Sequence, residues 1–203
     1  MKHVSRLLLV LGISHIAVSA KAQDKPDAQR QIDFSVFGAF TSASTGLSAG
    51  HNLDVSGGFD LNLPAMSFLR PGLEVRATSP FERTGIDRQQ DILTGPRVEF
   101  LFGRLHPYAD FLIGGGRIDY GDAAQPYVTY NDIQITGHST STVYSPGVGT
   151  SFDLTSHLAV FADLQAQHWD TPVSLSGHLL AKPLSFGVRY RFGMPGHTRN
   201  SPW

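Results

Sequence analysis

The chain has 203 residues, with 16 lysines and arginines against 17 aspartates and glutamates, and it contains no cysteine. The near-neutral charge balance argues against a nucleic-acid binder, and the lack of cysteine excludes disulfides, thiolate metal sites and the lipidated cysteine of a lipoprotein. With 21 glycines, 13 phenylalanines and 12 prolines, the composition favours an all-β protein with many turns.

The first 22 residues have the parts of a secretory signal peptide in their usual order. Basic side chains lie among the first six positions, an apolar run follows at residues 7–13, and AKA at residues 20–22 is a small-residue cleavage site. The apolar run is well short of the roughly 20 residues that a membrane-spanning helix needs. We therefore expect export and cleavage before Gln23, with a flexible polar leader over residues 23–32.

The first two predicted strands are residues 33–41 and 52–63, and both show the period-two alternation of a strand whose faces meet different surroundings. The second is the clearer, with Leu53, Val55 and Phe59 on one face. A tilted strand needs about 9–11 residues to cross a bilayer, and residues 52–63 stay in step for long enough.

The next two predicted strands are residues 68–78 and 91–102. The second contains Pro96, which cannot donate a hydrogen bond to a sheet ladder. A closed barrel has no free edge for such a residue, so we expect a bulge or a shortened strand there.

Three further strands are predicted at residues 107–115, 144–154 and 158–168. In the first of them Leu112 points to the polar side, so the alternation is imperfect. The long connection after it contains residues 127–136, which could form a short hairpin of their own, and residues 169–183 are expected to be the last loop.

The last predicted strand, residues 184–192 (LSFGVRYRF), has one apolar and aromatic face and one small and cationic face. Links after the second, fourth and sixth strands are short, and the others are long. This asymmetry is typical of an up-and-down transmembrane barrel with short periplasmic turns and long external loops. We therefore predict an eight-stranded antiparallel up-and-down transmembrane β-barrel over residues 33–192 and a C-terminal tail over residues 193–203. The aromatic girdles are expected to include Phe102, Phe152 and Phe192 at the inner interface and Phe40, Tyr144 and Trp169 at the outer one.

The exported, cysteine-free chain and its closing GVRYRF (residues 187–192) resemble the small eight-stranded outer-membrane barrels of the OmpA and OmpX type. The resemblance implies residence in the outer membrane of a Gram-negative-type bacterium, in contact with its lipids and lipopolysaccharide. It also implies insertion by the barrel-assembly machinery, with Tyr190 and Phe192 as the assembly signal. The family usually ends at this terminal aromatic residue, whereas here residues 193–203 follow. A soluble barrel of the lipocalin kind is the structural alternative, and it would carry the arginines outside and an apolar cavity inside.

The inward positions of the predicted strands carry nearly balanced charges: Arg70, Arg76, Arg97, Arg189 and Arg191 against Asp54, Asp60, Glu74, Glu99, Asp110 and Asp163. An eight-stranded barrel is just wide enough inside for side chains to fill, and buried charges must be paired to offset their desolvation. We therefore expect a packed network of ion pairs that plugs the lumen. A polar path that opens as a narrow pore is the alternative.

Four histidines fall in or beside the predicted external loops: His51, His138, His168 and His178. His138 with Ser139, or His168 with Asp170, could belong to a lipid- or ester-cleaving site, but solvated loop histidines are the ordinary interpretation. The sequence has no metal-ligand spacing, nucleotide-binding loop or nucleophile elbow. We therefore expect no catalytic, cofactor or metal site. The predicted function is that of a non-catalytic outer-membrane barrel with a structural or surface-interaction role, in which the long loops can meet extracellular partners. A small-solute pore and, less favoured, a lipid or ester hydrolase are the alternatives.

Overall fold

The computed structural model describes residues 32–44, 52–81, 88–119, 127–130, 133–171 and 177–192, and their regular structure is entirely β. The predicted signal peptide, most of the predicted leader, the predicted C-terminal tail and His51 lie outside the described residues. The strands are β1 Asp33–Ala43, β2 Asn52–Asn62, β3 Leu69–Pro80, β4 Arg88–Phe100, β5 Leu105–Asp119, β6 Tyr127–Tyr130, β7 Ile133–Thr136, β8 His138–Asp153, β9 Leu158–Gln165, β10 Gln167–Asp170, β11 His178–Ala181 and β12 Leu184–Phe192. Over the described ranges, no helix has the length and apolarity needed to cross a membrane.

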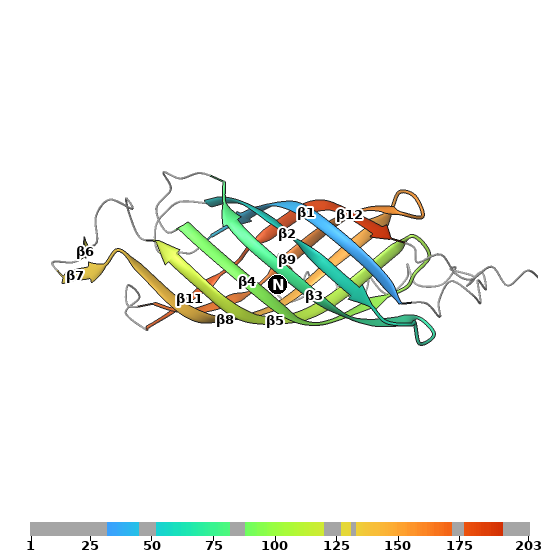
Figure 1. The fold of residues 1–203 in the computed structure, drawn as a ribbon, viewed down its shortest axis with the longest axis horizontal. Helices are drawn as coiled ribbons and strands as arrows, with labels where there is room; N and C mark the ends of the chain where they lie inside the picture. The colour runs from blue at the N-terminus through green and yellow to red at the C-terminus, as the bar shows by residue number, and fades with distance from the viewer. Residues whose placement is uncertain are drawn as a thin grey trace, which may run out of the picture.

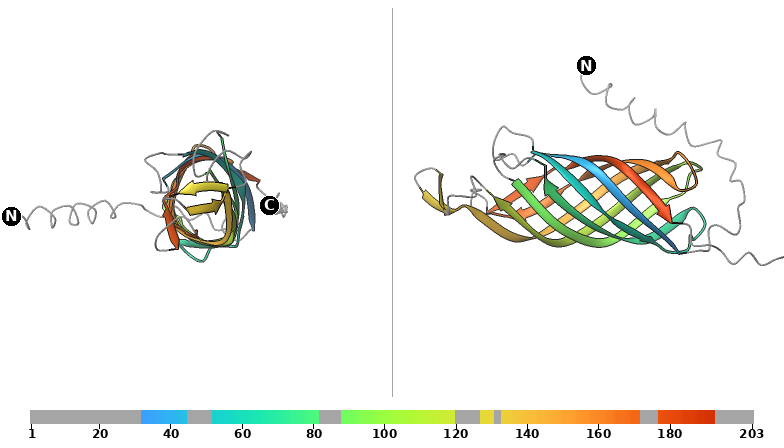
Figure 2. Two further views of the ribbon diagram at one scale, coloured as in Figure 1. Left: turned by 90° about the vertical axis from the view of Figure 1, so that its left-hand side faces the viewer. Right: turned by 45° about the horizontal axis from the view of Figure 1, so that its top comes forward.

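The long strands form a closed antiparallel barrel in the order β1, β2, β3, β4, β5, β8, β9 and β12. Pairing of β12 with β1 closes the ring, from Phe34 opposite Phe192 to Ser42 opposite Leu184. Figure 1 shows the strands tilted along the barrel, and the view along its axis in Figure 2 shows the closed ring. The prediction of an eight-stranded antiparallel up-and-down barrel is confirmed.

Strands β9 and β10 form one long segment of the barrel wall, and β11 and β12 form the antiparallel segment beside it. The first breaks at Ala166, whose backbone N–H donates to the carbonyl of Pro146 at 2.9 Å. The second breaks before Pro183, whose carbonyl accepts from the backbone N–H of Gln165 at 3.0 Å. The two breaks therefore lie at the same level along the barrel. On the side of the breaks away from β9 and β12, strands β10 and β11 continue as a paired hairpin.

The two faces of the barrel follow the predicted alternation. On β12 the guanidinium groups of Arg189 and Arg191 are buried inside, whereas Phe186 is 59% exposed on the outside. Exposed apolar side chains surround the barrel, among them Phe40, Phe59, Leu73, Ile92, Phe111, Val148, Phe152, Leu164, Phe186, Val188 and Phe192. An apolar exterior around a polar interior is the arrangement of a transmembrane barrel and the reverse of a lipocalin. Single-chain bacterial barrels of this architecture lie in the outer membrane, so the chain is an outer-membrane barrel.

The two ends of the barrel differ in the length of their connections. Short links join β2 to β3, β4 to β5 and β8 to β9, and the chain enters β1 and leaves β12 at the same end. We assign this end to the periplasm because outer-membrane barrels have short periplasmic turns. The opposite, external end carries the hairpin of β6 and β7, which pair as predicted and project beyond the barrel in Figure 1.

The prediction of a bulge or a shortened strand at Pro96 is wrong. Strand β4 runs through this residue, and Pro96 stands opposite Leu73 of β3 in unbroken register. Toward β5 the paired positions stop at Thr94 and resume at Arg97, with the same register on both sides. The missing N–H is therefore accommodated by a local gap in one ladder. Gly95 allows β4 and β5 to approach closely at this gap, because a Cβ at this position would overlap the carbonyl oxygen of Phe111.

The prediction that residues 169–183 form a loop, with Trp169 in the outer aromatic girdle, is also wrong. Trp169 lies in β10, and its side chain is 0% exposed inside the barrel. It continues the inward series of Asp163, Gln165 and Gln167, which are all buried. Phe40 and Tyr144, expected in the same girdle, do face outward.

Candidate functional site

The periplasmic end of the lumen contains a group of charges centred on Glu99. Its carboxylate lies 3.6 Å from both Arg70 and Arg191. Arg191 also pairs with Asp153 at 2.7 Å, and His106 lies beside it, with Nδ1 3.2 Å from the Arg191 guanidinium. These side chains come from β3, β4, β5, β8 and β12, so they link distant strands across the barrel.

Asp60 is the centre of the next group. Its carboxylate lies 2.7 Å from Arg189 Nε and 3.1 Å from Arg97 Nη1. The Ser35 hydroxyl donates to the same carboxylate at 3.1 Å. One buried anion therefore joins β1, β2, β4 and β12, which include both sides of the closing seam.

Arg76 connects two further carboxylates. Its guanidinium lies 2.7 Å from Glu74 and 2.6 Å from Asp163. The Tyr108 hydroxyl donates to Asp163 at 3.0 Å. The Gln165 amide donates to Asp163 and, at 3.0 Å, to Asp110. This group spans the lumen from β3 to β9.

Aromatic rings lie among these charges. The Arg97 guanidinium lies over the Tyr108 ring, 3.8 Å from its centroid. Arg189 lies 4.8 Å from the Phe161 ring centroid and 5.5 Å from that of Phe37. Such cation–π contacts stabilise guanidinium groups that are removed from water. We call this whole assembly the charged lumen cluster: Arg70, Glu74, Arg76, Arg97, Glu99, Asp110, Asp163, Arg189 and Arg191, with Asp60, Tyr108, Phe37 and Phe161.

The external half of the lumen contains a buried cluster of apolar side chains, which lies beside buried polar groups such as Asp91 and Gln167. We call these apolar side chains the apolar plug: Leu93, Leu112, Ile118, Val143, Trp169, Leu179 and Ala181, which form one buried cluster. Along β5, Leu112 and Ile118 follow His106, Tyr108 and Asp110, so the plug lies on the external side of the charges. The Trp169 indole N–H donates to Gln167 at 3.2 Å, which satisfies its polar atom inside the barrel. The inward Leu112 that interrupted the sequence pattern belongs to this plug.

Tyr190 and Phe192 lie on the outer face at the periplasmic end. Their ring centroids are 4.9 Å apart, and the Phe192 ring lies 5.8 Å from that of Phe34 on the neighbouring strand. Their proposed part in assembly remains a prediction.

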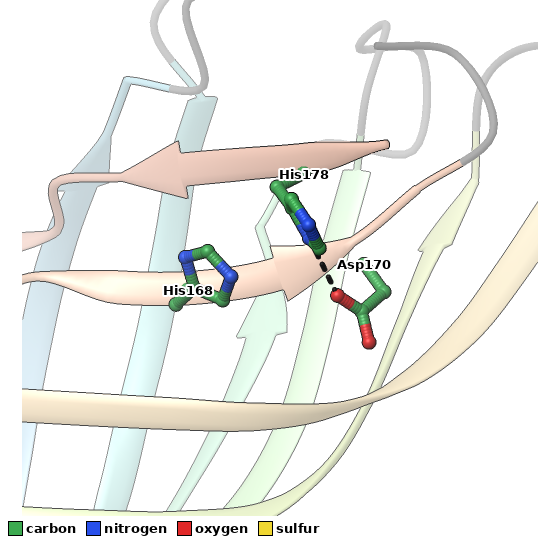
Figure 3. Close-up of side chains that lie close together, drawn as sticks. All are labelled: His168, Asp170 and His178. Carbon is green, nitrogen blue, oxygen red and sulfur yellow. Dashed lines mark hydrogen bonds and ion pairs between the residues drawn. The ribbon is translucent and has the colours of Figure 1, made fainter. Parts of the chain in front are cut away.

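At the external rim the structure brings together His168, Asp170 and His178, all exposed (Figure 3). His178 Nδ1 lies 2.8 Å from Asp170 Oδ1, and the two imidazole centroids are 5.0 Å apart. His168 and Asp170, considered above only as a possible part of a cleavage site, are therefore joined by His178 from across the hairpin. His138 lies at the start of β8 and is not part of this group.

No protein-family model and no curated protein matches the chain. Among solved structures, it is similar to Neisserial surface protein A, with 16% identity, a TM-score of 0.49, and coverage of 79% of this chain and 97% of that one. It is also similar to the attachment invasion locus protein Ail of Yersinia pestis in complex with a heparin analogue, with 10% identity, a TM-score of 0.49 and coverage of 79% and 97%. A third similar structure is the N-terminal β-barrel domain of Pseudomonas aeruginosa OprF, with 17% identity, a TM-score of 0.42 and coverage of 80% and 100%.

Proposed function

We propose that the chain is a non-catalytic, non-conducting barrel that holds its external loops at the surface of the outer membrane. The observation that carries this proposal is the filling of the lumen at two successive levels. The charged lumen cluster lies in the periplasmic part, and the apolar plug, with the buried polar side chains beside it, lies in the external part. A solute on its way through the barrel would have to displace both.

Opening the charged level is costly. Asp60 and Arg97 are both buried and lie in contact, and separating such a pair without water leaves two uncompensated charges. Breaking a buried ion pair by removing one partner costs about 3–5 kcal/mol. The network therefore supports a structural role, in which it fixes the register of the strands, over a role as a conduction path.

The surface role is supported by the unequal ends of the barrel. The long connections and the β6–β7 hairpin gather at the external end, where extracellular partners could bind them. The apolar exterior fits outer-membrane lipids and the acyl chains of lipopolysaccharide. The closing strand, which ends in Tyr190 and Phe192, fits the part of substrate for the barrel-assembly machinery.

A conductance measurement tests the proposal. The purified barrel in planar bilayers is expected to give no discrete channel events, whereas a narrow pore would give them in the unmodified protein. The double variant Trp169→Ala/Leu112→Ala removes the largest side chain of the plug and one of its leucines, and it is expected to raise ion leakage. Phe186→Ala, a large-to-small truncation on the outer face, is the control and should leave the bilayer sealed. Regular conductance steps in the unmodified barrel would overturn the proposal.

The non-catalytic part of the proposal has its own test. The rim histidines supply bases and Asp170 a carboxylate, but the three residues contain no hydroxyl or thiol nucleophile of the kind that ester-cleaving enzymes use. Purified barrel is expected to release no fatty acid from lipid A or from short-chain ester substrates. Release that disappears in a His168→Ala/His178→Ala variant would establish the hydrolase instead.

A further inference from the structure

Three side chains that can ligate a metal converge on the β10–β11 hairpin. Asp170 stands directly opposite His178 in the hairpin, and His168 precedes Asp170 by two residues. Because alternate residues of a strand share a face and directly paired residues are close, this register places all three on one side. Their ligating atoms all lie within 4.8 Å of one another, and all three side chains are exposed on the outside of the barrel (Figure 3).

We propose that His168, Asp170 and His178 form a binding site for a divalent transition-metal ion of the zinc class. Two imidazole nitrogens and one carboxylate oxygen are a donor set typical of zinc, and three protein ligands leave a fourth position for water. Magnesium and calcium prefer all-oxygen sets, so the histidines select against them. With bonds of about 2.0–2.2 Å the ligating atoms must approach one another more closely, which exposed side chains can achieve by rotation about their χ angles.

The existing contact within the group resembles the bound arrangement. His178 Nδ1 lies 2.8 Å from Asp170 Oδ1, with the N–H donating to the carboxylate. A metal ion that takes both atoms as ligands replaces this hydrogen bond, and the single N–H of the neutral imidazole ring then lies on Nε2. The Asp170 carboxylate is an anionic ligand and offsets part of the charge of the ion.

The position of the hairpin gives the ion a structural consequence. β11 forms one edge of the sheet order and pairs with β10. Within the described strands, β10 joins β8 through the pair of His168 with Tyr144, and Lys182 N–H donates to the Ser44 carbonyl at 3.2 Å beside β1. An ion held by residues of both β10 and β11 would fasten the two strands to each other above the breaks in the barrel wall.

The site also lies where metal from the external medium can reach it. Leu180, the next outward residue on β11, is 50% exposed, and Tyr144 lies beside His168 on β8. These apolar side chains mark the external border of the membrane-facing surface, so the ligands lie at that border and not in the lumen. The proposal is therefore independent of whether the barrel conducts.

Calorimetric titration of the untagged, detergent-folded barrel with zinc chloride tests the site. We expect binding of one ion per chain, weakened at least about tenfold in His168→Ala, in His178→Ala and in Asp170→Asn. His138→Ala removes an exposed histidine at the same end of the barrel and should leave binding unchanged. Because all the altered side chains are exposed, each variant should keep the heat-modifiable gel migration of a folded barrel.

Copper(II) serves as a spectroscopic probe of the ligands. Electron paramagnetic resonance should report coupling to two imidazole nitrogens in the unmodified barrel and in His138→Ala, and to one in each single histidine variant. The proposal is overturned if the folded barrel shows no saturable zinc binding up to about 1 mM. It is equally overturned if the His168→Ala/His178→Ala double variant binds zinc as tightly as the unmodified chain.

Discussion

Phe34 and Phe192 stand opposite each other in the ladder that closes the barrel, with their ring centroids 5.8 Å apart. Phe34 also lies 5.8 Å from Phe59, and Phe192 lies 4.9 Å from Tyr190. The first and last strands of the ring therefore meet in a continuous aromatic surface at the periplasmic interface. An aromatic cluster at this level both anchors the barrel and joins its seam.

Replacing Phe192 with serine is expected to lower the yield of inserted barrel in cells. The residue is the last of the closing strand and also contacts Phe34 across the seam. The fraction of heat-modifiable protein in the outer membrane measures the effect. Phe152→Ser is the matched control, since Phe152 is also an outward aromatic residue near the periplasmic end but lies on β8. An equal loss in both variants would mean that interface anchoring, and not the terminal position, limits insertion.

Period-two alternation predicted the barrel and its polar interior, because side-chain direction in a strand depends only on the parity of the position. The same rule could have placed Trp169, which has the parity of Asp163 and Gln165. The predicted strand ends at His168, so Trp169 falls one residue outside it, in the predicted loop. Parity also could not give the partners of each charge, because these depend on the stagger between strands.

The cluster of His168, Asp170 and His178 could not be predicted from the sequence, for a different physical reason. His168 and Asp170 share a face by parity, but His178 reaches them only through the register of β10 with β11. The length of the link between these strands does not determine that register, so histidine spacing along the chain carried no metal-site signal. The unbroken course of β4 through Pro96 could not be predicted either, since it depends on the close approach of Gly95 to the carbonyl of Phe111.

Asp60→Asn is expected to destabilise the barrel strongly, by about 3–5 kcal/mol, because Arg97 and Arg189 lose the anion between them. Urea unfolding in detergent, followed by tryptophan fluorescence, measures the loss. Asp119→Asn removes the partner of Arg117 in an ion pair of 2.8 Å whose arginine is 48% exposed. Exposed pairs contribute about 0–1 kcal/mol, so this control should unfold nearly as the unmodified barrel does. Similar losses of unfolding free energy in the two variants would show that the buried ion pairs of Asp60 stabilise the barrel no more than an exposed pair does.

Trp169→Ala is expected to open the apolar plug to solvent. The chain has no cysteine, so a single Val143→Cys substitution, close in size and fully buried, reports on access to the plug. Its thiol should resist a maleimide reagent in the otherwise unmodified barrel and react in the Trp169→Ala background. Leu180→Ala, on the outward face of β11, should not increase the labelling. A thiol that reacts readily before Trp169 is removed would show that the plug admits water in its normal state.

Gly149 and Gly115 give a matched pair for the packing of the charged lumen cluster. Gly149 stands opposite Tyr108 in the β5–β8 ladder, and a Cβ there would overlap the Tyr108 ring. Alanine at this position must displace the ring from Asp163 and from the Arg97 guanidinium, both of which it contacts.

We therefore expect Gly149→Ala to destabilise the barrel by about 1–3 kcal/mol, as overpacking of a filled core does. Gly115 has open space around the same added atom. Gly115→Ala should therefore be neutral or stabilise by about 0.4–1 kcal/mol, since alanine narrows the unfolded ensemble. Unfolding midpoints in urea compare the two variants. If Gly149→Ala proved as stable as Gly115→Ala, Tyr108 would have to move freely, and the lumen could not be packed as tightly as the non-conducting role requires.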